Sequence, residues 1–199
     1  MSNSFIEAFK ARRTQYALGK NLPISQDETA ALIKEAVRLS PSAFNSQSSR
    51  VVILFGAHHD KFWGFVKSAL QKIVPADQFA PTEERLKGFR AGAGTALFYE
   101  DQTVVAKLQK DFAAYADNFP IWSEHSTGIA QVAAWTALAN ANIGASLQHY
   151  NPLPDADAAK EWGISPDWKL RAQLVFGSNE GPIGTKEFID DSTRFKVFG

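Results

Sequence analysis

A long run of uncharged residues marks the centre of the predicted fold. From His125 to Asn151 the chain contains no Asp, Glu, Lys or Arg. Apolar positions recur there every three or four residues, which predicts a helix from Ser123 to about Asn142 with one buried face. Polar residues interrupt the run before it could span a membrane, and Gly144 is expected to end the helix. The buried face should consist of Ile129, Val132, Ala133, Trp135, Thr136, Ala139 and Ile143.

The same spacing predicts a series of shorter helices. Two of them open with capping-box patterns, at Ser4–Glu7 and Ser25–Glu28, in which the first side chain accepts a backbone hydrogen bond and the last returns one. Asp101 and Asp155 can each accept the first backbone N–H groups of a later helix. In chain order these helices are expected at residues 4–13, 25–40, 60–73, 101–112 and 155–162, with a short additional one after residue 82.

Strands are predicted where apolar residues run together or alternate, at residues 51–55, 95–99, 145–149 and 169–176. The alternation from Thr193 to Phe198 also allows an edge strand that pairs with a second subunit. Helices and strands mix without a regular βαβ order. This order favours a single α+β domain over residues 1–199 rather than a doubly wound parallel sheet.

Composition excludes several classes of function. The net charge is zero, so we expect no binding to nucleic acid or to an anionic membrane. The chain has no cysteine, which removes disulfides, thiolate catalysis and cysteine-ligated metals. The opening MSNSFIEAFKARR contains no uninterrupted apolar segment, so it does not match a signal peptide and a cytoplasmic location is expected. A small molecule or another protein is the expected partner.

Three partial motifs carry little weight. Ala91–Gly94 has two glycines of a dinucleotide fingerprint but lacks the third and precedes a strand. Ser146 lacks the glycine frame of a serine-hydrolase nucleophile. His58 and His59 are adjacent, so their side chains point in different directions, and a solvated turn before the next helix is favoured over a metal site. No metal is expected.

Basic residues gather near both ends of the chain. Arg12, Arg13 and Thr14 follow the first predicted helix, and Arg194 and Lys196 lie near the carboxyl end. The first group alone is best explained as an ordinary solvated face. Guanidinium and hydroxyl donors from both ends would suit a phosphate monoester, and the sequence leaves open whether the two ends meet.

Together these features resemble the nitroreductase family of flavin enzymes. The resemblance lies in a first helix ending R-R-T, the loop S-P-S-A-F-N-S-Q before an apolar strand, the uncharged helix running into N-I-G-A-S-L-Q-H-Y, and the basic pair near the carboxyl end. Their order covers nearly the whole chain. The segments F-R-A-G-A-G-T-A-L-F and S-L-Q-H-Y-N-P are most similar to a small subgroup related to fungal fatty-acid-repression proteins.

The resemblance implies an α+β sandwich with a mixed or antiparallel central sheet flanked by helices. In this family two chains intertwine as a homodimer and hold FMN in two clefts at the interface. By carry-over, the phosphate site comprises Arg12, Arg13, Thr14, Arg194 and Lys196. The ring is bordered by Pro41, Ser42, Ala43, Asn45 and Gln47 of the other subunit, and its N5 edge by Leu147, Gln148 and His149. Arg85, Lys87 and Arg90 are the candidates for the flavin pyrimidine.

The implied activity is a ping-pong oxidoreductase reaction. NADH or NADPH would pass hydride to flavin N5, and a nitroaromatic or quinone acceptor would then use the same place. No side chain of the protein need be catalytic. Phe44, Phe119 and Trp122 are candidates for the cleft walls, although packing is the favoured role for each. One alternative is a flavin-binding sensor or store with little turnover, and another is an interaction protein without a cofactor.

Overall fold

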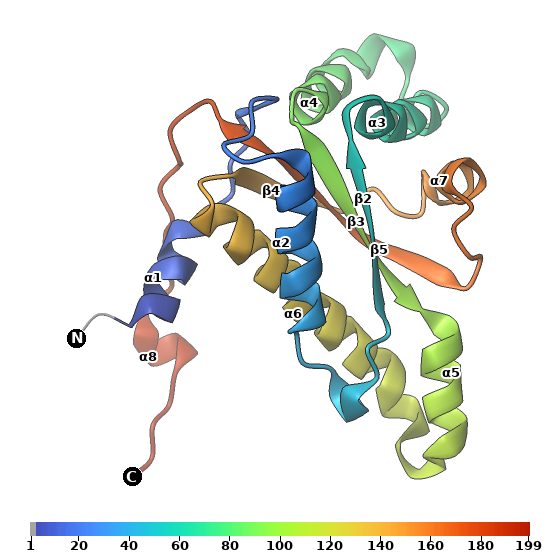
Figure 1. The fold of residues 1–199 in the computed structure, drawn as a ribbon, viewed down its shortest axis with the longest axis vertical. Helices are drawn as coiled ribbons and strands as arrows, with labels where there is room; N and C mark the ends of the chain where they lie inside the picture. The colour runs from blue at the N-terminus through green and yellow to red at the C-terminus, as the bar shows by residue number, and fades with distance from the viewer. Residues whose placement is uncertain (1–2) are drawn as a thin grey trace.

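A five-stranded antiparallel sheet with helices on both faces forms the body of the protein (Figure 1). The structure is a computed structural model that describes residues 3–199. The edge strand β2 (Ser49–Phe55) pairs with β3 (Gly94–Asp101), and β3 pairs with β5 (Trp168–Asn179). On its other side β5 pairs with β4 (Gly144–Gln148) and, near its end, with the two-residue β1 (Leu18–Gly19). The four predicted strands within the body are therefore confirmed, and β1 was not predicted.

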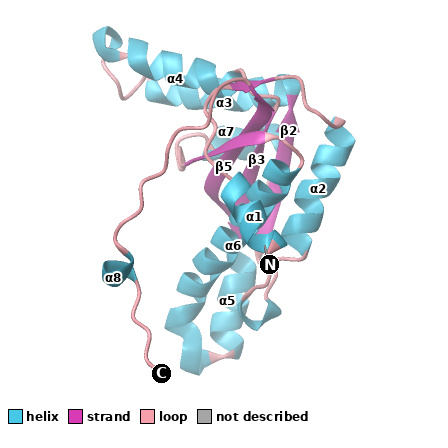
Figure 2. Ribbon diagram, turned by 90° about the vertical axis from the view of Figure 1, so that its left-hand side faces the viewer, coloured by secondary structure: helices cyan, strands magenta, loops and turns pink. Residues whose placement is uncertain are grey.

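Helices cover the two faces of the sheet as separate layers. On one face, α2 and α6 pack over a core that includes Ile33, Phe98 and Leu138. On the other, α3, α4 and α7 pack over a core that includes Trp63 and Leu97 (Figures 1 and 2). The expected α+β sandwich is confirmed. The helices are α1 (Ser4–Ala11), α2 (Gln26–Arg38), α3 (Gly56–Leu70), α4 (Ala80–Arg90), α5 (Gln102–Asp111), α6 (Phe119–Asn140), α7 (Asp155–Trp162) and α8 (Asp191–Arg194), with short 3-10 turns at Ala43–Asn45, Ala76–Gln78 and Ala113–Asn118.

Two of the predicted helix caps are confirmed. The backbone N–H of Glu28 donates to Ser25 Oγ at 3.2 Å, and the N–H of Ser25 donates to Glu28 Oε2 at 2.9 Å, so this capping box is complete. At the start of α5, Asp101 Oδ1 accepts the N–H of Thr103 at 3.0 Å. Both caps are local in sequence, which explains why they could be predicted.

The other two predicted caps were wrong by one residue. Asn3 caps α1, because its Oδ1 accepts the N–H groups of Phe5 and Ile6 at 3.0 and 3.4 Å, and Ser4 is already helical. Asparagine is among the strongest capping residues and precedes the serine, so it takes the position first. Asp155 lies inside the first turn of α7 and makes no capping bond.

The buried face of α6 differs from the predicted one. The helix starts at Phe119. Between the large buried residues Phe119 and Leu138, its buried residues are small or polar: Ser123, Ser126, Thr127, Ala130, Gln131 and Ala134. Of the predicted face, Ile143 is buried, but Ile129 is 40% exposed and Val132, Ala133 and Thr136 are only half-buried. Small residues allow the helix to approach its neighbours closely, so the bulkier residues remain on the open side. The helix ends at Asn140, and Asn142 takes the left-handed conformation (φ 58°) before Gly144 begins β4, so the prediction that Gly144 ends the helix was wrong.

The last part of the chain leaves the body as a tail. The predicted edge strand from Thr193 to Phe198 is not formed, because α8 ends at Arg194 and no strand follows it within residues 3–199. Val197 and Phe198 are 92% and 90% exposed. Figure 2 shows this segment running away from the sheet, where it has no strand of its own chain to pair with. A strand needs such a neighbour for its backbone hydrogen bonds.

No helix within residues 3–199 is both long and apolar enough to cross a lipid bilayer.

Candidate functional site

The segment after α1 runs along the open edge of β4. Thr14 forms a parallel β-bridge with Ala145, and the N–H of Gln15 donates to the carbonyl of Ala145 at 2.9 Å. The side chain of Gln15 also donates to the carbonyl of Gly181 at 2.7 Å. These bonds place the predicted phosphate-binding segment beside the strand that carries residues 147 and 148.

Arg12 has a donor group that no atom in the described part of the chain satisfies. Its guanidinium lies over the Trp135 ring, 4.6 Å from the ring centre, and its Nε is buried without a hydrogen-bond partner within residues 3–199. Burial, together with the neighbouring Arg13, lowers the pKa of Arg12. A buried N–H normally has an acceptor, and an anionic oxygen would also offset the cost of burying the charge. The residues present therefore fit a phosphate group.

The three residues predicted to border the flavin N5 edge point in different directions. Leu147 packs against the core on the α6 side of the sheet, whereas Gln148 lies on the opposite side, because successive strand residues alternate. Gln148 opens into a cavity of about 550 Å³, which is also lined by Tyr16, Arg85, Gly88 and Phe89. Among the described residues that line this cavity there is one cation, Arg85, and no carboxylate.

His149 lines a different cavity, of about 330 Å³, on the α6 side. Arg171 lies there because a bulge in β5 leaves it without a partner on β3: Phe98 pairs with Ala172 and Tyr99 with Leu170. The Nε of Arg171 donates to Glu124 Oε2 at 2.8 Å. This cavity is polar but its charges are already paired.

Among the three basic residues proposed for the flavin pyrimidine, the structure singles out Arg85. Lys87 donates to Glu84 at 2.5 Å, which raises the pKa of Lys87, and Arg90 lies 3.6 Å from Asp60. Arg85 forms no ion pair within residues 3–199 and lines the Gln148 cavity. Arg85 is favoured over Lys87 and Arg90 because those two side chains are already paired with carboxylates. The sequence does not show such pairing.

The loop from Pro41 to Gln47 is strained. Phe44, Asn45 and Gln47 all have left-handed backbone conformations, with φ of 56°, 49° and 47°. Each such residue costs on the order of 1 to 3 kcal/mol, and strain of this kind clusters at functional sites. Ser42 holds the loop closed, because its carbonyl accepts the N–H of Asn45 at 3.0 Å and its Oγ accepts the N–H of Gln47 at 2.9 Å.

Aromatic side chains surround Phe44 at the centre of this loop. The Phe44 ring centre lies 5.9 Å from that of Trp122, with the planes 18° apart, and 5.2 Å from that of Phe119. Phe119 is buried and packs, as expected, whereas Phe44 and Trp122 line an apolar cavity of about 410 Å³. Phe112 and Tyr115 complete the cluster, at 4.9 and 6.1 Å from Phe44, and were not predicted. They lie outside any motif in the sequence.

Within one chain the loop and the phosphate segment contact different parts of α6. The loop contacts the helix near Trp122 and Ile129, whereas Arg12 contacts it at Trp135. Thirteen residues of helix separate Trp122 from Trp135, which is roughly 20 Å along the axis. One chain therefore does not bring these two groups of predicted site residues together.

Arg194 and Lys196 are exposed on the tail. The Arg194 guanidinium lies 5.5 Å from the centre of the neighbouring Phe195 ring, and Figure 2 shows α8 standing apart from the body. Their assignment to a phosphate site stays a prediction, as do the other assignments to the cofactor.

Comparison with known proteins identifies the family. The sequence model of the nitroreductase family matches residues 9–178. This chain belongs to the nitroreductase family. Nitroreductase FRM2 of Saccharomyces cerevisiae is 34% identical over 193 residues, which cover 96% of this chain and 95% of FRM2. Membership confirms the resemblance stated from the sequence, including the fungal subgroup, and the general prediction of a flavin-dependent oxidoreductase.

Solved structures confirm the nitroreductase fold. Nitroreductase CinD from Lactococcus lactis, in complex with chloramphenicol, is 52% identical with a TM-score of 0.91, and the match covers 98% of this chain and all of CinD. A nitroreductase with bound FMN from Desulfitobacterium hafniense covers the whole of both chains with a TM-score of 0.72 at 15% identity. The second likeness shows that the fold persists when most side chains differ.

Proposed function

We propose that this nitroreductase binds FMN at the interface of a homodimer and transfers electrons from NADH or NADPH to nitroaromatic or quinone acceptors. The observation that supports it most directly is the unsatisfied, partly buried guanidinium of Arg12 beside β4. Family membership supplies the reaction class. When bound, FMN accepts hydride at N5 and returns the electrons to an acceptor, so the protein needs no acid or base of its own.

The residues along β4 would hold the cofactor at its two ends. Arg12, Arg13 and the hydroxyl of Thr14 supply donors for the phosphate. Arg85 and Gln148 lie in the cavity on the other side of the strand, where they would orient the pyrimidine edge of the ring. A cation there would stabilise negative charge on the reduced ring, and the cavity has no carboxylate to oppose it.

A second chain is needed to complete this site. The loop from Pro41 to Gln47 shares a cavity with α6 between Trp122 and Ile129, whereas Arg12 contacts the helix at Trp135, so we assign the loop to the ring bound by the partner. Gln47 belongs to the end of the loop nearest the sheet, and Asn45 is exposed at its tip. The cavity beside this loop, lined by Phe44 and Trp122, then lies next to the ring and would receive the acceptor.

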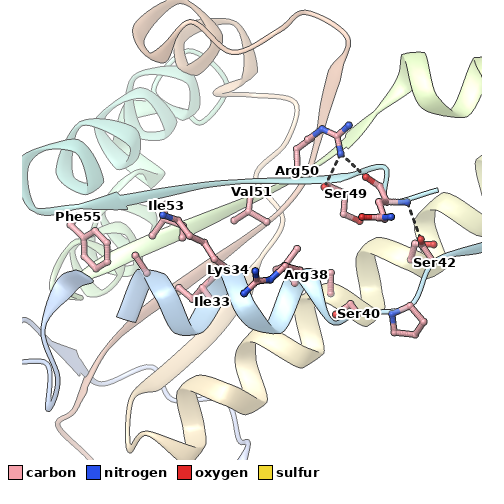
Figure 3. Close-up of a pocket in the computed structure, with 16 residues that line it drawn as sticks. Ile33, Lys34, Arg38, Ser40, Ser42, Ser49, Arg50, Val51, Ile53 and Phe55 are labelled. Atoms are coloured by element: carbon pink, nitrogen blue, oxygen red, sulfur yellow. Dashed lines mark hydrogen bonds between the residues drawn. The ribbon is translucent and has the colours of Figure 1, made fainter. Parts of the chain in front are cut away.

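The chain offers two apolar surfaces for such a partner. One is the open side of α6, with Ile129 exposed. The other is a groove of about 520 Å³ between α2 and the edge strand β2 (Figure 3). An edge strand has unpaired backbone groups, and Phe195, which directly follows α8, already has an extended backbone. The groove is lined by the apolar residues Ile33, Val37, Val51, Ile53 and Phe55 and by the polar or charged residues Lys34, Arg38, Ser40, Ser42, Gln47, Ser49, Arg50 and Ser126. We infer that the tail of one subunit lies along β2 of the other.

Nitroaromatic acceptors fit the apolar cavity, because flat rings stack on aromatic side chains. CinD has been solved with chloramphenicol and with 4-nitrophenol, and both molecules contain a nitrobenzene ring. Quinones are flat molecules of similar size. No feature of the described residues separates NADH from NADPH.

A flavin-binding sensor or store is the remaining alternative. It would be yellow, but NADH oxidation would be no faster with an acceptor than without one.

One experiment separates the proposed oxidoreductase from the sensor or store. The absorbance spectrum of the purified protein should show bound FMN, anaerobic NADH should bleach it, and adding menadione or 4-nitrophenol should restore the colour with multiple turnovers. A protein that stays colourless after incubation with FMN would overturn the proposal. Bleaching without recovery on adding any acceptor would favour the store.

A further inference from the structure

The peptide groups of Gln47 are held on both sides by side chains. Its N–H donates to Ser42 Oγ at 2.9 Å, and its carbonyl accepts from Arg50 Nη1 at 2.6 Å. Figure 3 shows Ser42 and Arg50 at the same end of the groove, with these hydrogen bonds drawn as dashed lines. Gln47 is left-handed without being glycine, so these two bonds stabilise a conformation that the residue would otherwise rarely adopt.

Arg50 is itself fixed to the sheet. Its backbone pairs with Tyr99 in the β2–β3 register, and its Nη2 donates to Asp101 Oδ2 at 3.1 Å. The guanidinium also lies 5.8 Å from the centre of the Trp168 ring. The side chain is 30% exposed and that of Asp101 only 11%. Arg50 therefore joins the strained loop to the central sheet.

A second tie fixes the segment between the loop and the strand. Ser48 and Ser49 both donate through their hydroxyls to the buried carboxyl group of Glu100, each at 2.5 Å. The N–H of Asp101 donates to the carbonyl of Ser48 at 3.0 Å. These bonds fix the chain from Ser48 onward. The conformation of Gln47, the residue before it, therefore depends on its hydrogen bonds with Arg50 and Ser42.

We propose that Arg50 is a positioning residue that fixes the loop from Pro41 to Gln47 of one subunit against the FMN bound by its partner. The inference rests on the proposed function, which places this loop on the partner's cofactor. Arg50 therefore controls FMN affinity in the opposite subunit, although it is remote from the phosphate site of its own chain. A guanidinium suits this task because it can donate to Gln47 and Asp101 at once, which an ammonium group on a flexible chain does poorly.

The first test compares Arg50→Met with Arg50→Lys. We expect Arg50→Met to weaken FMN binding by roughly tenfold or more, because a charge-assisted bond to the loop is lost, and this loss should exceed what the lower melting temperature of the FMN-free protein accounts for, since Asp101 also loses its partner. Arg50→Lys should recover part of the affinity. The matched control is Lys67→Met, which removes an ion pair between α3 and α4 whose cation is about as exposed as Arg50 and should leave FMN affinity unchanged.

The second test asks in which subunit Arg50 acts. A heterodimer is purified from one chain carrying Arg12→Met and one carrying Arg50→Met, using two different affinity tags. If the inference is right, one site combines both defects, and the other combines an intact phosphate segment with an intact loop. FMN titration should therefore find one site of wild-type affinity per dimer, although neither variant homodimer has any.

The outcomes separate this inference from the proposed function. A wild-type protein that binds no FMN contradicts the proposed function itself. If the wild type binds FMN, then unchanged affinity in Arg50→Met, or two weak sites in the heterodimer, overturns the role of Arg50. Affinity lost only in proportion to the melting temperature also overturns it. Should Arg50→Met fail to fold, Arg50→Lys replaces it in the heterodimer with the same expected stoichiometry.

Discussion

The guanidinium of Arg12 lies 4.6 Å from the centre of the Trp135 ring, and this contact fixes the end of α1 against the second half of α6. A cation over an aromatic face is stabilised without using its N–H donors. Arg12 is therefore held in place with its donors available, as a site for an anionic oxygen requires. Arg50 shows the opposite arrangement, because its donors are committed to Gln47 and Asp101.

Replacing Arg12 by Met should weaken FMN binding by about ten- to a hundredfold, since hydrogen bonds to charged groups contribute roughly 1.5 to 3 kcal/mol. Riboflavin, which lacks the phosphate, should bind the variant and the wild type equally well. Fluorescence titration of the FMN-free protein with each flavin measures both affinities. An equal loss for FMN and riboflavin would show that Arg12 supports the fold and not the phosphate.

Replacing Arg85 by Met should lower the midpoint potential of bound FMN. The variant removes the one cation of the Gln148 cavity, so the negatively charged reduced ring is less stabilised. A shift on the order of 30 mV corresponds to about 1.4 kcal/mol for a two-electron couple. Arg90→Met is the control, because Arg90 is engaged with Asp60 and its loss should not move the potential. Dye-equilibrated anaerobic titration gives both values, and a larger shift in Arg90→Met would reverse the assignment.

Charges placed on one face of the tail should separate the subunits. If Phe195 and Val197 enter the groove beside β2, alternation along the extended segment after α8 leaves Lys196 on the other face, free for phosphate. The double variant Phe195→Asp, Val197→Asp should then be largely monomeric by sedimentation velocity. Phe198→Asp, on the opposite face, should remain dimeric. A double variant that stays dimeric at micromolar concentration would contradict the proposed packing of the tail.

His59 should make the protein less stable at acidic pH. It is buried between α3 and β3, with Nδ1 2.8 Å from Thr95 Oγ1, which also accepts from Trp63 Nε1 at 3.0 Å. Burial lowers the pKa of His59, although Asp60 opposes this. In the unfolded chain this histidine has a pKa of about 6.5. Just below that pH the unfolded state therefore binds a proton at His59 that the folded state does not. The stabilisation is therefore complete above the unfolded pKa and decreases as the pH falls through it.

Urea unfolding between pH 5 and pH 8 measures this dependence. The free energy of unfolding of the wild type should fall more steeply below pH 6.5 than that of His59→Leu. The comparison uses the difference in slope, because Glu100, whose pKa is raised by burial, titrates in both proteins. Parallel curves for the two proteins would mean that His59 does not cause the acid sensitivity.

Much of the fold could be predicted because its signals are local. The capping box at Ser25 and the cap at Asp101 involve residues two or three apart, and the apolar runs of β2, β3 and β5 are continuous in sequence. The family resemblance came from the order of such segments. The same local logic failed where two neighbouring residues competed for one position, as Asn3 and Ser4 do at the start of α1.

The arrangement of the site was decided by tertiary structure. Helical spacing predicts that α6 has a buried side, but only its neighbours determine that the side with Ala130 and Ala134 faces the sheet and that Ile129 faces outward. Likewise Arg85 is distinguished from Arg90 only by tertiary structure, because Arg90 forms an ion pair with Asp60, thirty residues earlier in the chain.

The sequence by itself determined most of the helices and strands, the family and the residues from which the candidate site is drawn. Which of those residues share a cavity, which arginine is left unpaired and what holds Gln47 in a left-handed conformation depend on distances between segments far apart in the chain. Those distances are fixed when the sheet and its two helical layers pack together, because packing selects one arrangement from many that the local pattern allows.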